Sequence, residues 1–244
     1  MRSKETTNMI YTTLKQEILS LAIRPGELKK EGDLCDRFKA SRTPVHAALE
    51  RLSEAGLIEF IPYKGVRATL LNFSDIYQNI MMRILLETKA VQDFSRTANP
   101  FAIERCMHVL RKQEILLENG PFVETAFYAL DVELHQHWFE ETGFPLFWQI
   151  IQEAEISYTR FRMLDIVEMH AFRDLVQEHR VLLLLIEQQK FEEIEQVITY
   201  HLFGGIRRMD AVLQTDLRMY FSDCNDIEKY LDKVRAIKKP QSLA

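Results

Sequence analysis

Glycine and proline are scarce in this chain, which has 8 glycines and 7 prolines in 244 residues. Both residues interrupt helices, so their scarcity, together with 47% hydrophobic residues in long periodic segments, favours a mainly helical protein. No apolar run approaches the ~20 residues that cross a bilayer. The first residues lack the continuous apolar core of a signal peptide. We therefore expect no membrane span.

Cysteine is scarce as well. Cys35, Cys106 and Cys224 are an odd, widely spaced set without a CxxC pair. Such a set excludes a disulfide framework and indicates a reducing compartment. The sequence thus predicts a cytoplasmic protein.

Positive charge is in deficit overall but not at the start of the chain. The net charge is −5. Residues 1–72 hold 12 Lys and Arg against 9 Asp and Glu, a net +3, whereas the remainder holds 19 against 27, a net −8. A basic head on an acidic body is an asymmetry that nucleic-acid binders show.

The first 72 residues have the pattern of a winged helix-turn-helix domain. Apolar residues at helical spacing predict helices over residues 9–21, 28–40 and 41–56. Residues 57–71 alternate and are interrupted by Pro-Tyr-Lys-Gly at 62–65, which predicts a small β-hairpin. In this domain the helix after the turn enters the major groove.

The candidate DNA contacts lie where that geometry needs them. Arg42, at the start of the third helix, can fork onto guanine or hold a phosphate, and Ser41 and Thr43 supply hydroxyl donors. Lys64 at the hairpin tip is placed for the DNA backbone or the minor groove. The alternative is a small α/β domain with a few surface cations.

Residues 9–70 resemble the DNA-binding domain of the GntR family of bacterial transcription regulators. The resemblance implies a dimer that binds a double-stranded, pseudo-palindromic operator in the bacterial nucleoid. It rests on Pro25-Gly26, Ser41-Arg42-Thr43-Pro44-Val45, Ala48-Leu49, Arg51-Leu52, Gly56-Leu57 and the Gly65 tip.

One position departs from the family pattern. His46 stands where the family usually has an arginine that commonly contacts DNA. Histidine can still donate hydrogen bonds but is mostly uncharged at neutral pH. His46 and Gly65 complete the candidate DNA-binding set, and the operator sequence stays open.

From residue 72 onward the chain reads as helix and short loop. We expect about six helices, with breaks at 98–100, 119–121, 143–145, around 164–165 and near 188–190. This is an all-α antiparallel bundle over 73–244. An amphipathic helix at about 226–238 is expected to dock on it.

Four polar residues fall on apolar helix faces. Asp131 and His135 are four apart on one face, whereas His137 lies about 200° from His135 and points away. His179 and His201 each lie eleven residues from the turn near Lys190, which puts them at one level of an antiparallel hairpin.

A lone inward histidine is more often a hydrogen-bonded core residue than a metal ligand. Three histidines with a carboxylate form a set that suits zinc, nickel, manganese or iron. A bound cation would offset the cost of burying Asp131.

The order Asp131-x3-His135, His179, His201 resembles the FCD domain, the helical effector domain of a large GntR subgroup. Arg83 and Glu87 resemble that domain's first-helix pattern, in which the arginine faces the effector pocket. The resemblance implies metal ligands at Asp131, His135, His179 and His201, and effector binding at Arg83.

The sequence therefore predicts a ligand-responsive regulator rather than an enzyme, with a DNA-binding domain over 1–72 and an effector-binding, dimerisation domain over 73–244. Binding of a small organic acid at the metal would shift the linker near residues 70–74. This shift would change the distance between the two DNA-binding domains of the dimer. In an alternative, the metal ion itself is the effector. A metal-dependent hydrolase is a third class, and it would need a general base beside a metal-bound water. Glu178 points about 100° around the helix from His179 and is not placed to act as that base.

Overall fold

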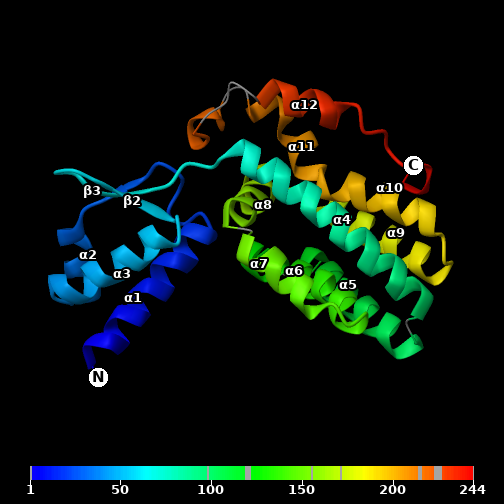
Figure 1. Cartoon of the computed structure of the whole chain (residues 1–244), viewed down its shortest axis with the longest axis horizontal. Coiled ribbons are helices and arrows are strands. Elements are labelled where there is room, and N and C mark those ends of the chain that lie inside the picture. Colours follow the sequence, from blue (N-terminus) through cyan, green and yellow to red (C-terminus); the bar gives the residue numbers. More distant parts are fainter. Residues whose placement is uncertain are drawn as a thin grey trace.

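The computed structural model describes residues 2–97, 99–118, 122–154, 156–170, 172–213, 216–222 and 227–243. Figure 1 shows a small head of helices and strands beside a larger helical body, with the last part of the chain lying along the body. This is the mainly α architecture that the sequence predicts, with a three-stranded sheet in the head.

The head consists of α1 (Arg2–Leu19), β1 (Leu28–Lys29), α2 (Glu31–Phe38), α3 (Arg42–Glu54), β2 (Ile58–Ile61) and β3 (Gly65–Ala68). The strands are antiparallel in the order β1-β3-β2, so the predicted hairpin is the wing of a winged helix-turn-helix. The three helices pack on it through a core of their own, formed chiefly by Ile10, Leu14, Ile18, Leu34, Val45, Leu49 and Leu52.

The start of the predicted second helix is wrong. Leu28 and Lys29 form β1 and pair with Arg67 and Val66, and the helix begins at Glu31. Gly26, with φ +82°, turns the chain so that its N–H donates to the Ala68 carbonyl at 2.9 Å. Long-range pairing therefore decides the conformation here.

A glycine is required at the tip of the wing. Gly65 has φ +115°, and a Cβ placed on it would lie 2.3 Å from the Lys29 carbonyl oxygen. Only glycine combines this backbone conformation with so close an approach of β1.

The body is built from α4 (Phe73–Thr97), α5 (Pro100–Glu118), α6 (Glu124–Glu141), α7 (Pro145–Ala154), α8 (Ile156–Met169), α9 (Phe172–Glu187), α10 (Phe191–Leu202) and α11 (Gly204–Leu213). Thus eight helices, not about six, occur among the described residues between 73 and 213. The expected breaks at 143–145 and 188–190 are present, whereas residues 98 and 119–121 lie outside the described part of the chain.

The break expected around 164–165 is wrong. α8 runs through Leu164 and Asp165, both buried. The Asp165 carboxylate accepts hydrogen bonds from Arg208 at 2.6–3.2 Å. Asp165 is therefore a buried ion-pair partner within a helix and not a loop residue.

The chain ends in η1 (Arg218–Tyr220), α12 (Ile227–Arg235) and η2 (Gln241–Leu243). α12 is the amphipathic helix expected at about 226–238, and its Ile227, Leu231 and Val234 are buried. Residue 226 and Cys224 lie outside the described residues. Among the helices that the structure describes, none is long and apolar enough to cross a membrane.

Candidate metal centre

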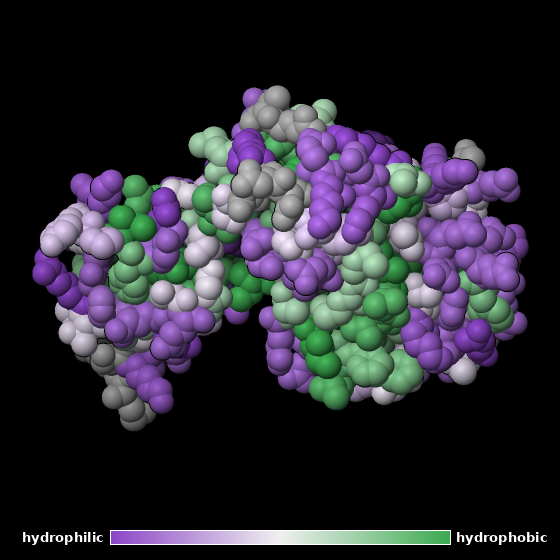
Figure 2. Space-filling model, turned by 45° about the horizontal axis from the view of Figure 1, so that its top comes forward, coloured by the Kyte–Doolittle hydropathy of each residue, from purple (hydrophilic) through white to green (hydrophobic). Residues whose placement is uncertain are grey.

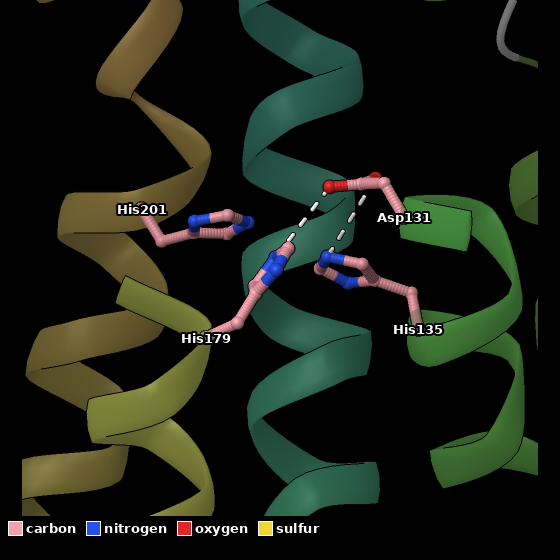
Figure 3. Close-up of side chains that lie close together, drawn as sticks. All are labelled: Asp131, His135, His179 and His201. Atoms are coloured by element: carbon pink, nitrogen blue, oxygen red, sulfur yellow. Dashed lines mark ion pairs between the residues drawn. The ribbon is translucent and has the colours of Figure 1, made fainter. Parts of the chain in front are cut away.

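Asp131, His135, His179 and His201 meet inside the body. Each of the four is buried, and one ligand atom of each lies within 4.8 Å of the others. Figure 3 shows Asp131 and His135 side by side on one helix, facing His179 and His201 on two others. Helical phase and hairpin register predict the two pairs, and the resemblance to the FCD domain implies that all four residues form one site.

Two local features bring the four residues together. On α6, the four-residue spacing stacks Asp131 and His135 on the buried face. The tight turn between α9 and α10, in which Gln189 has φ +54°, sets the hairpin register. The rings of His179 and His201 are consequently 4.7 Å apart, as their equal distance from the turn predicts.

His137 does not join the set. Its side chain is 20% exposed and its Nδ1 lies 3.8 Å from Glu140. The expected exclusion by helical phase is confirmed, because a residue two positions on from His135 cannot share its face.

Each of the three histidines has its Nδ1 held by a buried acceptor. The Nδ1 of His135 lies 2.6 Å from Glu87, that of His201 lies 2.8 Å from Glu178, and that of His179 lies 3.0 Å from the Gln113 amide oxygen. If each Nδ1 carries the proton, each Nε2 keeps its lone pair for a ligand. Metal-binding histidines are oriented by the same arrangement.

Several atoms at the centre are buried without a hydrogen-bond partner in the described structure. They are the Nε2 atoms of His135 and His179 and Oδ1 of Asp131. Asp131 Oδ1 lies 3.4 Å from His179 Nε2, and Asp131 Oδ2 lies 4.0 Å from His135 Nε2. Buried polar atoms normally have partners, so the nitrogen and oxygen donors here fit a divalent cation.

The electrostatics of the centre suit a cation. Burial alone would raise the pKa of Glu87, but Arg83 and His135 hold it well below its usual value, so Glu87 is a carboxylate. Burial, with the neighbouring histidines, lowers the pKa of His179 and His201 well below 6.5. Both rings are therefore neutral at pH 7, which is the form that binds metals.

Arg83 lies beside the centre and pairs with one of the carboxylates there. It is fully buried, its Nε donates to Glu87 at 2.5 Å, and its Nη2 lies 3.3 Å from His135 Nδ1. Arg83 thus helps to orient the carboxylate that orients His135. Effector binding by Arg83 stays a prediction.

Arg162 of α8 is a residue that sequence reasoning missed. Its guanidinium forms an ion pair with the Asp131 carboxylate and lies over the Tyr128 ring at 5.0 Å from the centroid. Burial lowers its pKa to about 10, so the group stays cationic at neutral pH. The wrong break at 164–165 concealed the central position of Arg162 in a helix.

The acceptors Gln113 and Glu178 were missed as well. Gln113 lies on the buried face of α5 with Val109 and Leu110, and a polar residue at that spacing was the available signal. Glu178 does point away from His179, but that direction leads to His201. Only the packing of α9 against α10 gives it a partner.

The candidate DNA contacts of the head are open to solvent. Ser41 has the N-cap position of α3 without a side-chain cap hydrogen bond, so its hydroxyl is available. Arg42, Thr43 and His46 are exposed on the same helix, and Lys64 is exposed beside Gly65 in the wing. The predicted DNA-binding side chains thus lie on two elements of the head's surface.

His46 has acidic neighbours on that surface. Its ring nitrogens lie 3.6 Å from Glu31 and 3.5 Å from Glu50, and its ring centroid is 5.5 Å from that of Phe60. The exposed face of α3 that carries Arg42 and His46 therefore also carries the carboxylate of Glu50.

A winged helix-turn-helix head joined to a helical body with a buried ligand site defines a DNA-binding regulator. Comparison with known proteins agrees. Residues 6–67 match the family described as bacterial regulatory proteins, gntR family, and residues 78–204 match the FCD domain. The chain belongs to the gntR family of regulators that carry an FCD domain, and it is a transcription regulator rather than an enzyme.

Relatives and solved structures extend the likeness over most of the chain. The HTH-type transcriptional repressor RspR of Escherichia coli K12 is 23% identical over 203 residues, covering 82% of this chain and 87% of RspR. The Nta operon transcriptional regulator of Aminobacter aminovorans is 25% identical over 184 residues, covering 75% and 85%.

Two solved structures share the fold. Escherichia coli McbR/YncC has a TM-score of 0.64 at 16% identity and covers 85% of this chain and 98% of its own. A putative GntR transcriptional regulator from Rhodococcus sp. RHA1 has a TM-score of 0.65 at 16% identity, covering 84% and 98%.

Proposed function

We propose that this regulator binds a pseudo-palindromic operator as a homodimer and that a small organic acid, held at a metal ion in the FCD domain, changes its affinity for DNA. The observation that carries the proposal is the anchoring of all three histidines through Nδ1, which leaves three Nε2 atoms and Asp131 converging on one point. A zinc, nickel, manganese or iron ion suits these donors and would supply a Lewis-acidic anchor for a carboxylate.

Two guanidinium groups support an anionic effector. Arg162 lies on Asp131, and Arg83 lies beside His135, close enough to Arg162 to lower its pKa. A cation on Asp131 would weaken the pairing of this carboxylate with Arg162, whose guanidinium has further N–H donors for an effector carboxylate. The open space lined by Arg162, Tyr158 and His201 is about 20 Å³, so the group that enters first is small.

An apolar surface of the body supports the homodimer. Met81 and Leu85 of α4 and Leu146 and Ile150 of α7 are exposed by 38–69%. Figure 2 shows a hydrophobic area on the helical body among otherwise polar surface. Exposed apolar patches of this kind mark protein interfaces, and two heads are needed to read two half-sites.

The test separates metal from acid. Operator affinity is measured with the metal-free protein, with zinc, nickel or manganese, with a panel of small carboxylates, and with both. We expect at least one carboxylate to change the affinity only when metal is present, and Arg162→Gln to abolish that change while metal binding persists.

Arg180→Gln is the matched control, because Arg180 is an exposed arginine of α9 that pairs with Glu114 away from the centre. Its response to acid should equal that of the native protein. A protein that binds none of the metals would contradict the proposal.

A second candidate function uses the same ligands. If the metal itself is the effector, zinc, nickel or manganese alone changes operator affinity and no carboxylate adds to the change. His179 and His201, which burial keeps neutral at pH 7, favour this second function as much as the first, and only the two arginines distinguish the two functions.

A further inference from the structure

The last part of the chain returns to the linker between head and body. This C-terminal segment, residues 216–222 and 227–243 as described, lies beyond the match to the FCD domain, which ends at residue 204. Figure 1 shows α12 lying along the body and the chain before it reaching back toward the junction with the head. Its position is fixed by contacts to residues that join the two domains.

The closest contact is a backbone bridge to the linker. The Leu71 N–H donates to the Tyr220 carbonyl at 2.8 Å, and the Ser222 N–H donates to the Leu71 carbonyl at 2.9 Å. Leu71 and Phe221 form an isolated parallel β-bridge, and both are buried. Both polar backbone groups of Leu71 are thus satisfied by the C-terminal segment.

Thr69, two residues before Leu71, is held by a side chain of the body. Arg160 of α8 is buried, its Nη1 donates to Thr69 Oγ1 at 3.0 Å, and its Nη2 donates to the Thr69 carbonyl. Burial lowers the pKa of Arg160 to about 10, so it remains a cation. The linker is therefore hydrogen-bonded to α8 at Thr69 and to the C-terminal segment at Leu71.

The same segment reaches the head itself. Arg24, in the turn after α1, donates to the Tyr220 hydroxyl at 2.6 Å and pairs with Glu168 of α8 at 3.2 Å. A cavity of about 250 Å³ lies beside this contact, lined by residues of the head, of α8 and by Tyr220. Leu21 of the head packs into the apolar core of the body, and Ile156 of α8 packs against the core of the head. These hydrogen bonds therefore add direction to a junction that is partly apolar and incompletely filled.

The segment is also tied to the helices that carry the metal centre. α11 follows α10, which bears His201, and its Arg208 pairs with Asp165 of α8. α8 carries both Arg162, on Asp131, and Arg160, on the linker. The contact at Thr69 therefore starts from α8, which also pairs with Asp131, and the contact at Leu71 follows α11, which is tied to α8 through Arg208.

We infer that Tyr220, Phe221 and Ser222 are positioning residues for DNA binding: they hold the linker at Leu71 and so fix the orientation of the head relative to the body. This role needs only the family's DNA-binding activity. We further infer that this contact with Leu71 makes the orientation of the head depend on whether the centre holds a metal. This second part rests on the proposed function.

Two pairs of variants test whether the contacts of Tyr220 and Ser222 fix the orientation of the head. Ser222→Pro removes the N–H that donates to the Leu71 carbonyl at 2.9 Å, whereas Ser222→Ala keeps this N–H and removes only the longer hydrogen bond from the hydroxyl to the same carbonyl at 3.3 Å. Tyr220→Phe removes only the hydroxyl that accepts from Arg24, whereas Met219→Ala changes a neighbouring residue that is 71% exposed. Tyr220→Phe differs by one oxygen atom and keeps the test decisive if Ser222→Pro fails to fold.

The readout is the distance between spin labels at Glu54→Cys in the head and Glu187→Cys in the body, both exposed positions. Cys35 and Cys224 are replaced by alanine, and labelled protein is diluted with unlabelled chains. We expect Ser222→Pro and Tyr220→Phe to broaden the distance distribution, and both controls to match the native protein. Native-like distributions in both test variants would overturn the inference.

The coupling to the centre is tested on the same proteins with zinc alone. We expect zinc to shift the distance distribution of the native protein and not that of Ser222→Pro, although both bind zinc with affinities within about twofold. An equal shift in both proteins would show that the contact between Ser222 and Leu71 does not link the metal centre to the orientation of the head. If zinc binds neither protein, the proposed function fails. The widths of the distance distributions measured without metal still show whether Tyr220 and Ser222 fix the orientation of the head.

Discussion

At the metal centre each histidine offers one ring nitrogen, because the other already has a partner. The partners differ in charge: Glu87 and Glu178 are carboxyl groups, whereas Gln113 is a neutral amide. A carboxylate partner raises the basicity of the ring it holds and an amide mainly orients it. His179 therefore depends on Gln113 for its orientation.

Replacing this amide should weaken metal binding without removing a ligand. We expect Gln113→Ala to lower metal affinity by about 10–100-fold, because the ring of His179 loses the acceptor that fixes its tautomer. The measurement is competition with a chelator of known affinity. Gln177→Ala, at an exposed position of α9, is the control and should change the affinity by less than about twofold.

The pH dependence of metal binding follows from the same burial. Protonation of a ring competes with the metal, and burial lowers the pKa of His179 and His201 well below 6.5. Neither ring should therefore take up a proton as the pH falls from about 8 to about 6. Burial raises the pKa of Glu178, the partner of His201, to about 7, so protonation of Glu178 should cause only a shallow loss of affinity in this range, with the steep loss setting in at lower pH. Chelator competition across this range is the check, and a steep loss starting near pH 6.5 would contradict it.

At the scale of elements, we expect α3 and the wing to make different kinds of contact with DNA. Arg42 at the start of α3 is placed for base edges or phosphate, and Lys64 in the wing for the backbone. Glu50 and Glu31 around His46 make the reading face less basic than an arginine at this position would. Affinity should thus rest on few cations.

We expect Arg42→Ala to weaken operator binding by about 1–3 kcal/mol and to reduce discrimination between operators if the contact is to a base. Lys64→Ala should weaken binding to all sequences alike and lower the salt dependence by about one phosphate contact. Arg37→Ala is the control, because Arg37 pairs with Glu17 within the head. Binding is measured by fluorescence anisotropy over a range of salt concentrations, and equal losses for Arg37 and Arg42 would contradict the assignment.

The elements also separate local signals from long-range ones. The helices 41–56 and 72–94 were predictable because periodic apolar faces coincide with capping and turn residues. Leu28 and Lys29 were assigned to a helix because their pairing with β3, nearly forty residues away, leaves no local trace. Asp165 resembled a loop residue because its partner Arg208 lies 43 residues further on.

At the scale of the whole molecule, we expect the exposed apolar side chains of α4 and α7 to form the proposed dimer interface. We expect Leu85→Glu and Leu146→Glu, at side chains 69% and 62% exposed, to convert a dimer into monomers, because a buried unpaired carboxylate opposes association. Sedimentation velocity provides the measurement. Phe101→Glu, at a residue of α5 that is 78% exposed, is the control and should leave the oligomeric state unchanged.

Operator affinity should follow the oligomeric state. A monomer reads one half-site, so the Leu85 and Leu146 variants should bind a full operator no more tightly than an isolated half-site. Metal affinity should be retained, since the centre lies inside one chain. Full operator affinity in a monomeric variant would contradict the dimer.

The sequence by itself determined the helical class, the winged head and the four residues of the candidate centre. Helical periodicity is a local property, and four polar residues on apolar faces are visible wherever that periodicity holds. The recognisable SRTPV segment added the family, and with it the expectation of DNA binding.

Only the tertiary structure decided what surrounds those four residues. Arg162, Gln113 and Glu178 reach the centre from helices whose mutual packing no local pattern encodes. The same holds for the bridge between Leu71 and Phe221, which joins residues 150 positions apart. Such contacts are set by how helices pack against one another, and packing depends on the shapes of all the side chains at once.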